Sequence, residues 1–265
     1  MEFTSILTPV LIFGAIGLVM AAVLAFASKI FAIETDPKEE QVLELLPGAN
    51  CGGCGYAGCS ALAAAIAKGE APCDGCPGIS AENFEKICAI MGVEAKAKKP
   101  MTALVMCSGT IDKANYRYFF DGSKTCRDIH AMQGGDKICA YACLGYGDCM
   151  EACKFGAISL KNGVAYISRN KCIGCGVCAN TCPKNVIQII PKDQDIVVRC
   201  SSKDKGAAMK AICSIGCIGC KICEKNCEAG AITVTDNLAV IDAEKCTGCG
   251  VCAEKCPKKV IHIRG

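Results

Sequence analysis

The sequence predicts an α+β protein with one N-terminal transmembrane helix, a small four-cysteine module and two tandem cysteine-rich lobes. Three observations support this prediction. Residues 6–27 are apolar and carry no charge. The 265 residues include 26 cysteines, many of them in Cys-x2-Cys spacing. In the C-terminal half, the pattern of cysteines recurs with a period of 74 residues.

The apolar run predicts a membrane anchor over residues 1–33. As a helix, residues 6–27 would extend about 33 Å, enough to cross a hydrocarbon core of ~30 Å. The chain starts with Met1, Glu2 and Phe3 rather than with basic residues, and the run is longer than the apolar part of a cleaved signal peptide. Lys29 and Lys38 follow the helix, which favours a single-pass protein of the cell membrane with its large domain on the cytoplasmic side.

The number of cysteines indicates metal sites rather than disulfides. Cysteine makes up about a tenth of the chain, but the chain is long and the spacings are the short ones of metal ligands. The formal net charge of +3 counts every thiol as neutral. Cysteines that bind a metal do so as thiolates, so the loaded protein would be more acidic than this count. A nucleic-acid partner is therefore not expected.

The first group of cysteines lies in a module predicted over residues 34–92. Its ligands are expected to be Cys51, Cys54, Cys59 and Cys76, with a helix between the third and the fourth. Four cysteines suit a [4Fe-4S] cluster, and they also satisfy tetrahedral zinc, which is the alternative. A linker and intermediate segment, residues 93–137, follows this module.

Two ferredoxin-like lobes are predicted over residues 138–191 and 192–265, the second including its lead-in. Each contains the Cys-x2-Cys-x2-Cys-x3-Cys-Pro run of bacterial two-cluster ferredoxins, in which the fourth cysteine ligates the other cluster. The predicted fold is thus a transmembrane helix, a [4Fe-4S] module and two 2x[4Fe-4S] lobes. In the second lobe, one cluster is assigned to Cys217, Cys220, Cys223 and Cys256, and the other to Cys227, Cys246, Cys249 and Cys252.

The first lobe departs from this pattern because Tyr146 stands where the repeat has Cys220. One cluster is assigned to Cys153, Cys172, Cys175 and Cys178. The other has Cys143, Cys149 and Cys182 and needs a fourth ligand, for which Cys139 is preferred and Cys126 is the competitor. The repeat places these two opposite Cys213 and Cys200, so structural thiols or a disulfide are also open for these pairs.

The spacing supports about five [4Fe-4S] clusters and leaves a sixth open. The cysteines without an assigned role are too irregularly spaced to define another site. They are Cys73, Cys88, Cys107, Cys126, Cys200 and Cys213.

The order of an anchor helix, a Cys-Gly-x-Cys-Gly module and two ferredoxin lobes resembles the RnfB family, the B subunits of Rnf complexes. The resemblance covers nearly the whole chain. It implies an electron-transfer subunit that accepts electrons from soluble ferredoxin and passes them to membrane and flavin-bearing subunits, in a complex that reduces NAD+ and translocates Na+ or H+. No complete active site is expected on this chain alone. The alternative is an electron-input subunit of another membrane oxidoreductase, such as a hydrogenase or dehydrogenase.

Overall fold

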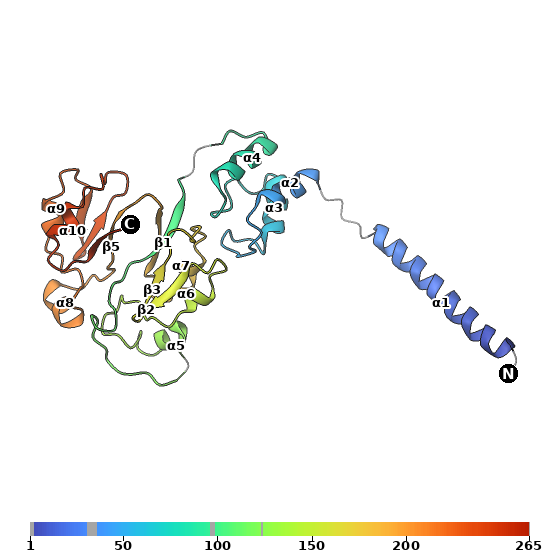
Figure 1. Cartoon of the computed structure of the whole chain (residues 1–265), viewed down its shortest axis with the longest axis horizontal. Helices are drawn as coiled ribbons and strands as arrows, with labels where there is room; N and C mark the ends of the chain where they lie inside the picture. The colour runs from blue at the N-terminus through green and yellow to red at the C-terminus, as the bar shows by residue number, and fades with distance from the viewer. Residues whose placement is uncertain (1–2, 31–35, 96–98, 123, 265) are drawn as a thin grey trace.

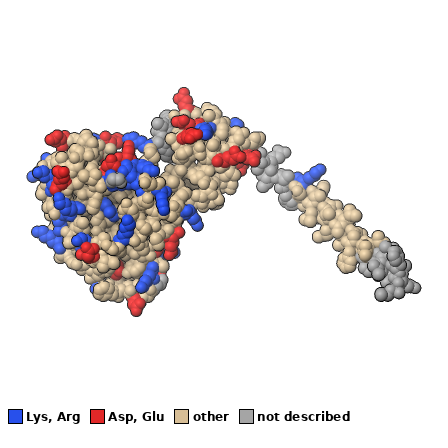
Figure 2. Space-filling view, in the orientation of Figure 1, with Lys and Arg blue, Asp and Glu red and all other residues tan. Residues whose placement is uncertain are grey.

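The computed structural model describes residues 3–30, 36–95, 99–122 and 124–264. Its first element, α1 (Phe3–Ile30), is the predicted anchor helix. The part from Val10 to Lys29 is long and apolar enough to span a membrane. Figure 1 shows α1 apart from the remaining elements, and Figure 2 shows an almost uncharged surface along it. The predicted boundary between anchor and module, at residues 33 and 34, lies outside the described residues.

Three helices form the module that follows: α2 (Pro37–Leu45), α3 (Cys59–Ala67) and α4 (Ala81–Met91). Asp36 caps α2 by accepting a hydrogen bond from the Lys38 amide, and Ser80 caps α4 through the Asn83 amide. The helices pack around a small apolar core that includes the fully buried side chains of Val42, Leu62, Ile66 and Ile87.

In the described part of the two lobes, the strands form four antiparallel pairs, two in each lobe. Each lobe has one hairpin, β2–β3 or β6–β7, and each pairs its lead-in strand with its last strand, β1 with β4 and β5 with β8. The strands are β1 (Met101–Val105), β2 (Ile158–Lys161), β3 (Val164–Ile167), β4 (Ile187–Pro191), β5 (Ile196–Val198), β6 (Ile232–Thr235), β7 (Leu238–Ile241) and β8 (Ile261–Ile263).

Short helices carry many of the cysteines of the lobes. In each lobe two such helices pack together, α6 with α7 and α9 with α10. The helices are α5 (Cys126–Ala131), α6 (Asp148–Glu151), α7 (Val177–Thr181), α8 (Gly206–Ile212), α9 (Ile222–Lys225) and α10 (Val251–Lys255).

The structure packs much of the predicted intermediate segment, 93–137, into the first lobe. Its strand β1 extends the sheet of that lobe by pairing with β4. Further along this segment, an isolated bridge joins Tyr116 to Lys137. Cysteines make up much of the buried core in both lobes, beside Val186 in the first and Val260 in the second. Folding of the lobes therefore depends on what the cysteines bind.

Candidate metal centres

The second lobe brings its first predicted group of cysteines together. A cavity of about 350 Å³ is lined by Cys217, Cys220, Cys223 and Cys256. Burial, with repulsion from Cys217 and Cys220, raises the pKa of the Cys223 thiol to about 11. The four cysteines thus line one partly buried space, in which burial disfavours an isolated thiolate.

The other predicted group of this lobe lies around Cys252. Burial raises the pKa of the Cys252 thiol, and repulsion from Cys246 and Cys249 adds to the effect. Cys227 packs on the same core, and its sulfur accepts a hydrogen bond of 3.3 Å from the Ala231 amide. In each of the two groups one cysteine is exposed, Cys220 in the first and Cys249 in the second.

The first lobe gathers its undisrupted group in the predicted way. Burial, followed by repulsion from Cys172, Cys175 and Cys153, raises the pKa of the Cys178 thiol to about 12. The sulfur of Cys172 accepts a hydrogen bond of 3.2 Å from the amide of Ala103 in β1. The lead-in strand therefore contacts this group directly.

The incomplete group of the first lobe differs from the preferred prediction. A cavity of about 360 Å³ is lined by Cys143, Cys149, Cys182 and Cys126, the competitor, while Cys139 does not line it. The carboxylate of Asp148 positions Cys126 by accepting hydrogen bonds from the amides of Cys126 (2.7 Å) and Arg127 (3.1 Å). The first turn of α5 is thereby fixed beside the cavity, and Cys126 is the fourth cysteine that lines it.

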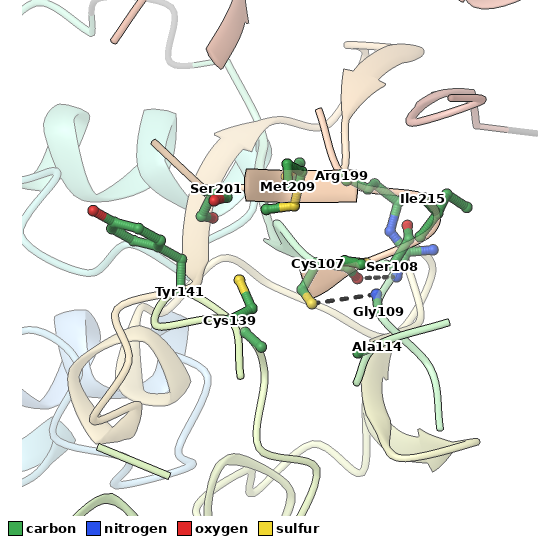
Figure 3. A pocket seen from close by; sticks show the side chains of 15 residues that line it. Cys107, Ser108, Gly109, Ala114, Cys139, Tyr141, Arg199, Ser201, Met209 and Ile215 are labelled. Carbon is green, nitrogen blue, oxygen red and sulfur yellow. Dashed lines mark hydrogen bonds between the residues drawn. The ribbon is translucent and has the colours of Figure 1, made fainter. Parts of the chain in front are cut away.

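The structure places Cys139 in another cavity, which lies where the two lobes meet. This cavity of about 340 Å³ is also lined by Cys107, Cys200 and Cys213 (Figure 3). Burial raises the pKa of the Cys139 thiol to about 11 and that of Cys200 to about 12. The short spacings in the sequence give no sign of this grouping, because all four residues come from separate segments.

The module brings together its four predicted cysteines. A cavity of about 370 Å³ is lined by Cys51, Cys54, Cys59 and Cys76, and also by Cys175 of the first lobe. The amide of Cys59, at the start of α3, donates a 2.7 Å hydrogen bond to the side-chain oxygen of Asn50. The module cavity thus borders directly on a cysteine of the neighbouring lobe.

These cavities fit a multi-atom cluster. Each of the four cavities is lined by at least four cysteines, which is the number of thiolate ligands that a [4Fe-4S] cluster takes. Backbone amides donate to several of the sulfurs, as is common around iron–sulfur clusters. The thiols with raised pKa values are protonated at neutral pH, so binding must displace their protons. When bound, a [4Fe-4S] cluster supplies a one-electron redox centre.

Three protein families match this chain, and all three are iron–sulfur families. The FeS family, described as an Fe-S cluster family, matches residues 46–77. The 4Fe-4S binding domain family matches residues 165–188. The 4Fe-4S dicluster domain family matches residues 216–260. Together with the cysteine groups, these matches indicate that the chain holds multiple [4Fe-4S] clusters.

Curated relatives match over nearly the whole chain. The B subunit of the Na(+)-translocating ferredoxin:NAD(+) oxidoreductase complex of Acetobacterium woodii is 42% identical over 97% of this chain and 78% of its own length. The B subunit of the ion-translocating oxidoreductase complex of Methanosarcina acetivorans is 40% identical over 98% of both chains. The counterpart from the proton-translocating ferredoxin:NAD(+) oxidoreductase complex of Clostridium ljungdahlii is 38% identical over 87% of this chain and 82% of its own. The chain therefore belongs to the family of B subunits of ion-translocating oxidoreductase complexes and is an iron–sulfur electron-transfer protein.

Proposed function

We propose that this chain accepts electrons from reduced ferredoxin and relays them within a membrane complex that reduces NAD+ and translocates Na+ or H+. The names of the relatives from Acetobacterium woodii and Clostridium ljungdahlii support ferredoxin and NAD+ as the redox partners of the complex. Flavin-bearing and membrane subunits would complete the route. The candidate span α1 supports attachment to the cell membrane. Lys29 and Lys38, which follow the span, favour the cytoplasmic side for the large domain.

Five groups of cysteines are proposed as cluster ligands. They follow the sequence prediction, except that Cys126 replaces Cys139. The groups are Cys51, Cys54, Cys59 and Cys76; Cys126, Cys143, Cys149 and Cys182; Cys153, Cys172, Cys175 and Cys178; Cys217, Cys220, Cys223 and Cys256; and Cys227, Cys246, Cys249 and Cys252.

Electrons would enter at the second lobe. Its exposed cysteines, Cys220 and Cys249, each mark a group that a soluble partner can approach. Lys221 and Lys258 line the same cavity as Cys220. Figure 2 shows Lys and Arg side chains over the body that contains both lobes, with Asp and Glu side chains among them. A reduced ferredoxin is anionic because its ligands are thiolates, and cationic side chains would steer it to this lobe.

Electrons would leave through the module. The observation that carries this direction is that Cys175 of the first lobe lines the cavity of the module cysteines. Repulsion from Cys51 also contributes to raising the pKa of Cys175, after burial. The module precedes the two lobes in the chain and follows α1 directly, which suits delivery of electrons to membrane subunits.

Stopped-flow mixing tests the proposed entry. The complex, in membrane vesicles under anaerobic conditions, is mixed with reduced ferredoxin, and the loss of visible absorbance is followed. Lys221→Glu should slow this phase, and the difference should shrink at high salt because the attraction is screened. Lys68→Glu makes the same charge change on the module and should have little effect. Failure of reduced ferredoxin to bleach the wild-type complex would overturn the proposal.

A further inference from the structure

The cavity between the lobes is the one four-cysteine group that the proposed function has not used. Cys107 follows β1, and Cys139 lies shortly before the first ferredoxin ligands of the first lobe. Cys200 follows β5, and Cys213 lies at the end of α8. Figure 3 shows the labelled side chains of Cys107 and Cys139 at this cavity, with Met209 and Arg199 beside them. Each lobe therefore contributes two thiols.

The two pairs occupy equivalent positions in the repeat. The amide of Met106 donates to the Val186 carbonyl at 2.7 Å, and the amide of Arg199 donates to the Val260 carbonyl at 2.9 Å. Because residues 186 and 260 are 74 apart, Met106 and Arg199 are equivalent, and so are the cysteines that follow them.

The second pair is equivalent as well. Cys139 and Cys213 are 74 residues apart, and each precedes the first ligand of its lobe, Cys143 or Cys217, by four positions. The repeat has thus kept the same two thiols in both lobes, and the fold brings all four to one cavity.

The space at the junction is similar in size to the spaces at the cluster sites proposed above. Its empty space is about 340 Å³, against about 350 Å³ and 370 Å³ at the second-lobe and module sites that family matches cover. Amides donate to its sulfurs in the same manner: Gly109 to Cys107 and Cys217 to Cys200, both at 3.4 Å.

Two cationic side chains, Lys137 and Arg199, lie beside the cavity and indicate that it binds an anionic group. Lys137 is 2% exposed, and its Nζ donates to the carbonyls of Gly109 (2.8 Å) and Gly163 (2.9 Å). It also lies 5.7 Å from the centre of the Tyr116 ring. Arg199 donates to the Cys107 carbonyl at 3.1 Å.

Neither cation has an acidic partner in the part of the chain that the structure describes: no ion pair joins Lys137 or Arg199 to a carboxylate there. Buried charges are normally paired. A four-thiolate cubane, at about −2, would supply the missing negative charge.

We propose that Cys107, Cys139, Cys200 and Cys213 hold a sixth [4Fe-4S] cluster at the junction of the two lobes, with Lys137 and Arg199 balancing its charge. The site extends the proposed relay. The amide of Cys217, a ligand of the second lobe, contacts Cys200, and Cys107 lies close enough to Cys143 of the first lobe to influence its pKa. The junction thereby connects the cavities of one lobe with those of the other.

Metal analysis of the full chain tests the site directly. Iron, acid-labile sulfide and zinc are measured per anaerobically purified chain, with EPR spectra after reduction. Six clusters correspond to about twenty-four irons. Cys139→Ser and Cys213→Ser should each remove about four irons with equal sulfide, while the EPR signals of the other clusters persist. Cys73→Ser, which changes a cysteine outside all six groups, is the matched control and should lose none.

A variant that removes a charge but no thiol tests the site even if a cysteine variant does not fold. Arg199→Met retains all four thiols, so the iron content should stay the same, while one cluster becomes harder to reduce in a potentiometric EPR titration. Arg199→Lys should largely restore the potential. Unchanged iron in both cysteine variants would overturn the proposal, and so would loss of one zinc in place of four irons. These measurements use no ferredoxin. The proposed cluster site and the proposed electron donor are therefore tested independently, and either can fail without the other.

Discussion

Gly53 of the module lies against the backbone of Cys175 in the first lobe, with no room for a side chain between them. A Cβ placed on Gly53 would lie 2.5 Å from the Cys175 carbonyl oxygen. Gly53 lies between Cys51 and Cys54. The contact therefore places the backbone of the module cysteine group directly against the backbone of the group that contains Cys175. Close approach, rather than an unusual backbone conformation, is the reason for glycine here.

Gly53→Ala is therefore expected to push the module away from the first lobe. The iron content should stay unchanged, because no ligand is altered, but the magnetic interaction between the module cluster and its neighbour should weaken in the EPR spectrum. Reduction of the module cluster by ferredoxin should also slow. Ser60→Ala, at an exposed position of the same module, is the control. An unchanged interaction in Gly53→Ala would rule out this contact as the electron route.

Cys126 is predicted to be the fourth ligand beside Cys143, Cys149 and Cys182. Cys126→Ser should remove about four irons per chain, as measured by iron and sulfide analysis. Asp148→Ala should keep the iron but make this cluster more sensitive to oxygen, because the two amides that fix α5 lose their acceptor. Full iron content in Cys126→Ser would show that another residue is the fourth ligand.

Tyr146 supports the first lobe in a different way from the cysteine that it replaces. Its hydroxyl donates a 2.6 Å hydrogen bond to Asp136, a carboxylate only 2% exposed. Tyr146→Phe should lower the free energy of unfolding by about 1–3 kcal/mol, because a buried acceptor loses its donor. The measurement is urea-induced loss of visible absorbance under anaerobic conditions. Tyr118→Phe, which removes an exposed hydrogen bond to Met132, should change it much less.

Cluster assembly should become more favourable as the pH rises. Burial raises the pKa of Cys178 and of Cys149 to about 12 from an ordinary value of 9.0. Both thiols are protonated at pH 7, and ligation requires thiolates, so each proton released favours binding at higher pH. Reconstitution of the cluster-free chain with iron and sulfide, followed by absorbance, should give a higher yield at pH 8.5 than at pH 6.5. A flat profile would show that these thiols are not protonated ligands.

Removal of residues 1–35 should release the chain from the membrane without loss of iron. The described side chains of α1 are almost all exposed, and its apolar surface has no cover within the described chain. Sedimentation of a membrane fraction, with metal analysis of the supernatant, checks both parts. Retention of the truncated chain in the membrane would indicate that partner subunits hold it independently of α1.

Spacing in the sequence predicts those groups of cysteines whose members lie close together along the chain. The groups around Cys223, Cys252 and Cys178 follow Cys-x2-Cys runs, and in the structure cysteines of each run lie near one another. The module cysteines were also found, because a short helix returns the chain to Cys76. The anchor helix followed from the absence of charge over residues 6–27.

The fourth cysteine of the broken group could not be chosen from spacing. Cys139 is nearer in sequence to Cys143 than Cys126 is, but the hydrogen bonds of Asp148 bring α5 to the cavity. The junction site was hidden for a related reason. The interval from Cys107 to Cys139 is 32 residues, whereas that from Cys200 to Cys213 is 13. The two repeats therefore differ in the spacing of this pair of cysteines. The equivalence of Cys107 and Cys200 becomes clear only from the pairing of β1 with β4 and of β5 with β8.

The shared junction also bears on the ancestry of the chain. One repeat carries only half of the four-thiol set, so a single-lobe ancestor would have completed it by pairing with an identical copy. Joining two copies in one polypeptide makes that pairing independent of protein concentration and lets the copies diverge. The longer interval in the first copy contains Cys126, which lines the cavity of the group in which Tyr146 stands opposite Cys220. The tandem lobes thus have the organisation of a fused homodimer in which the first half has different cysteine positions from the second.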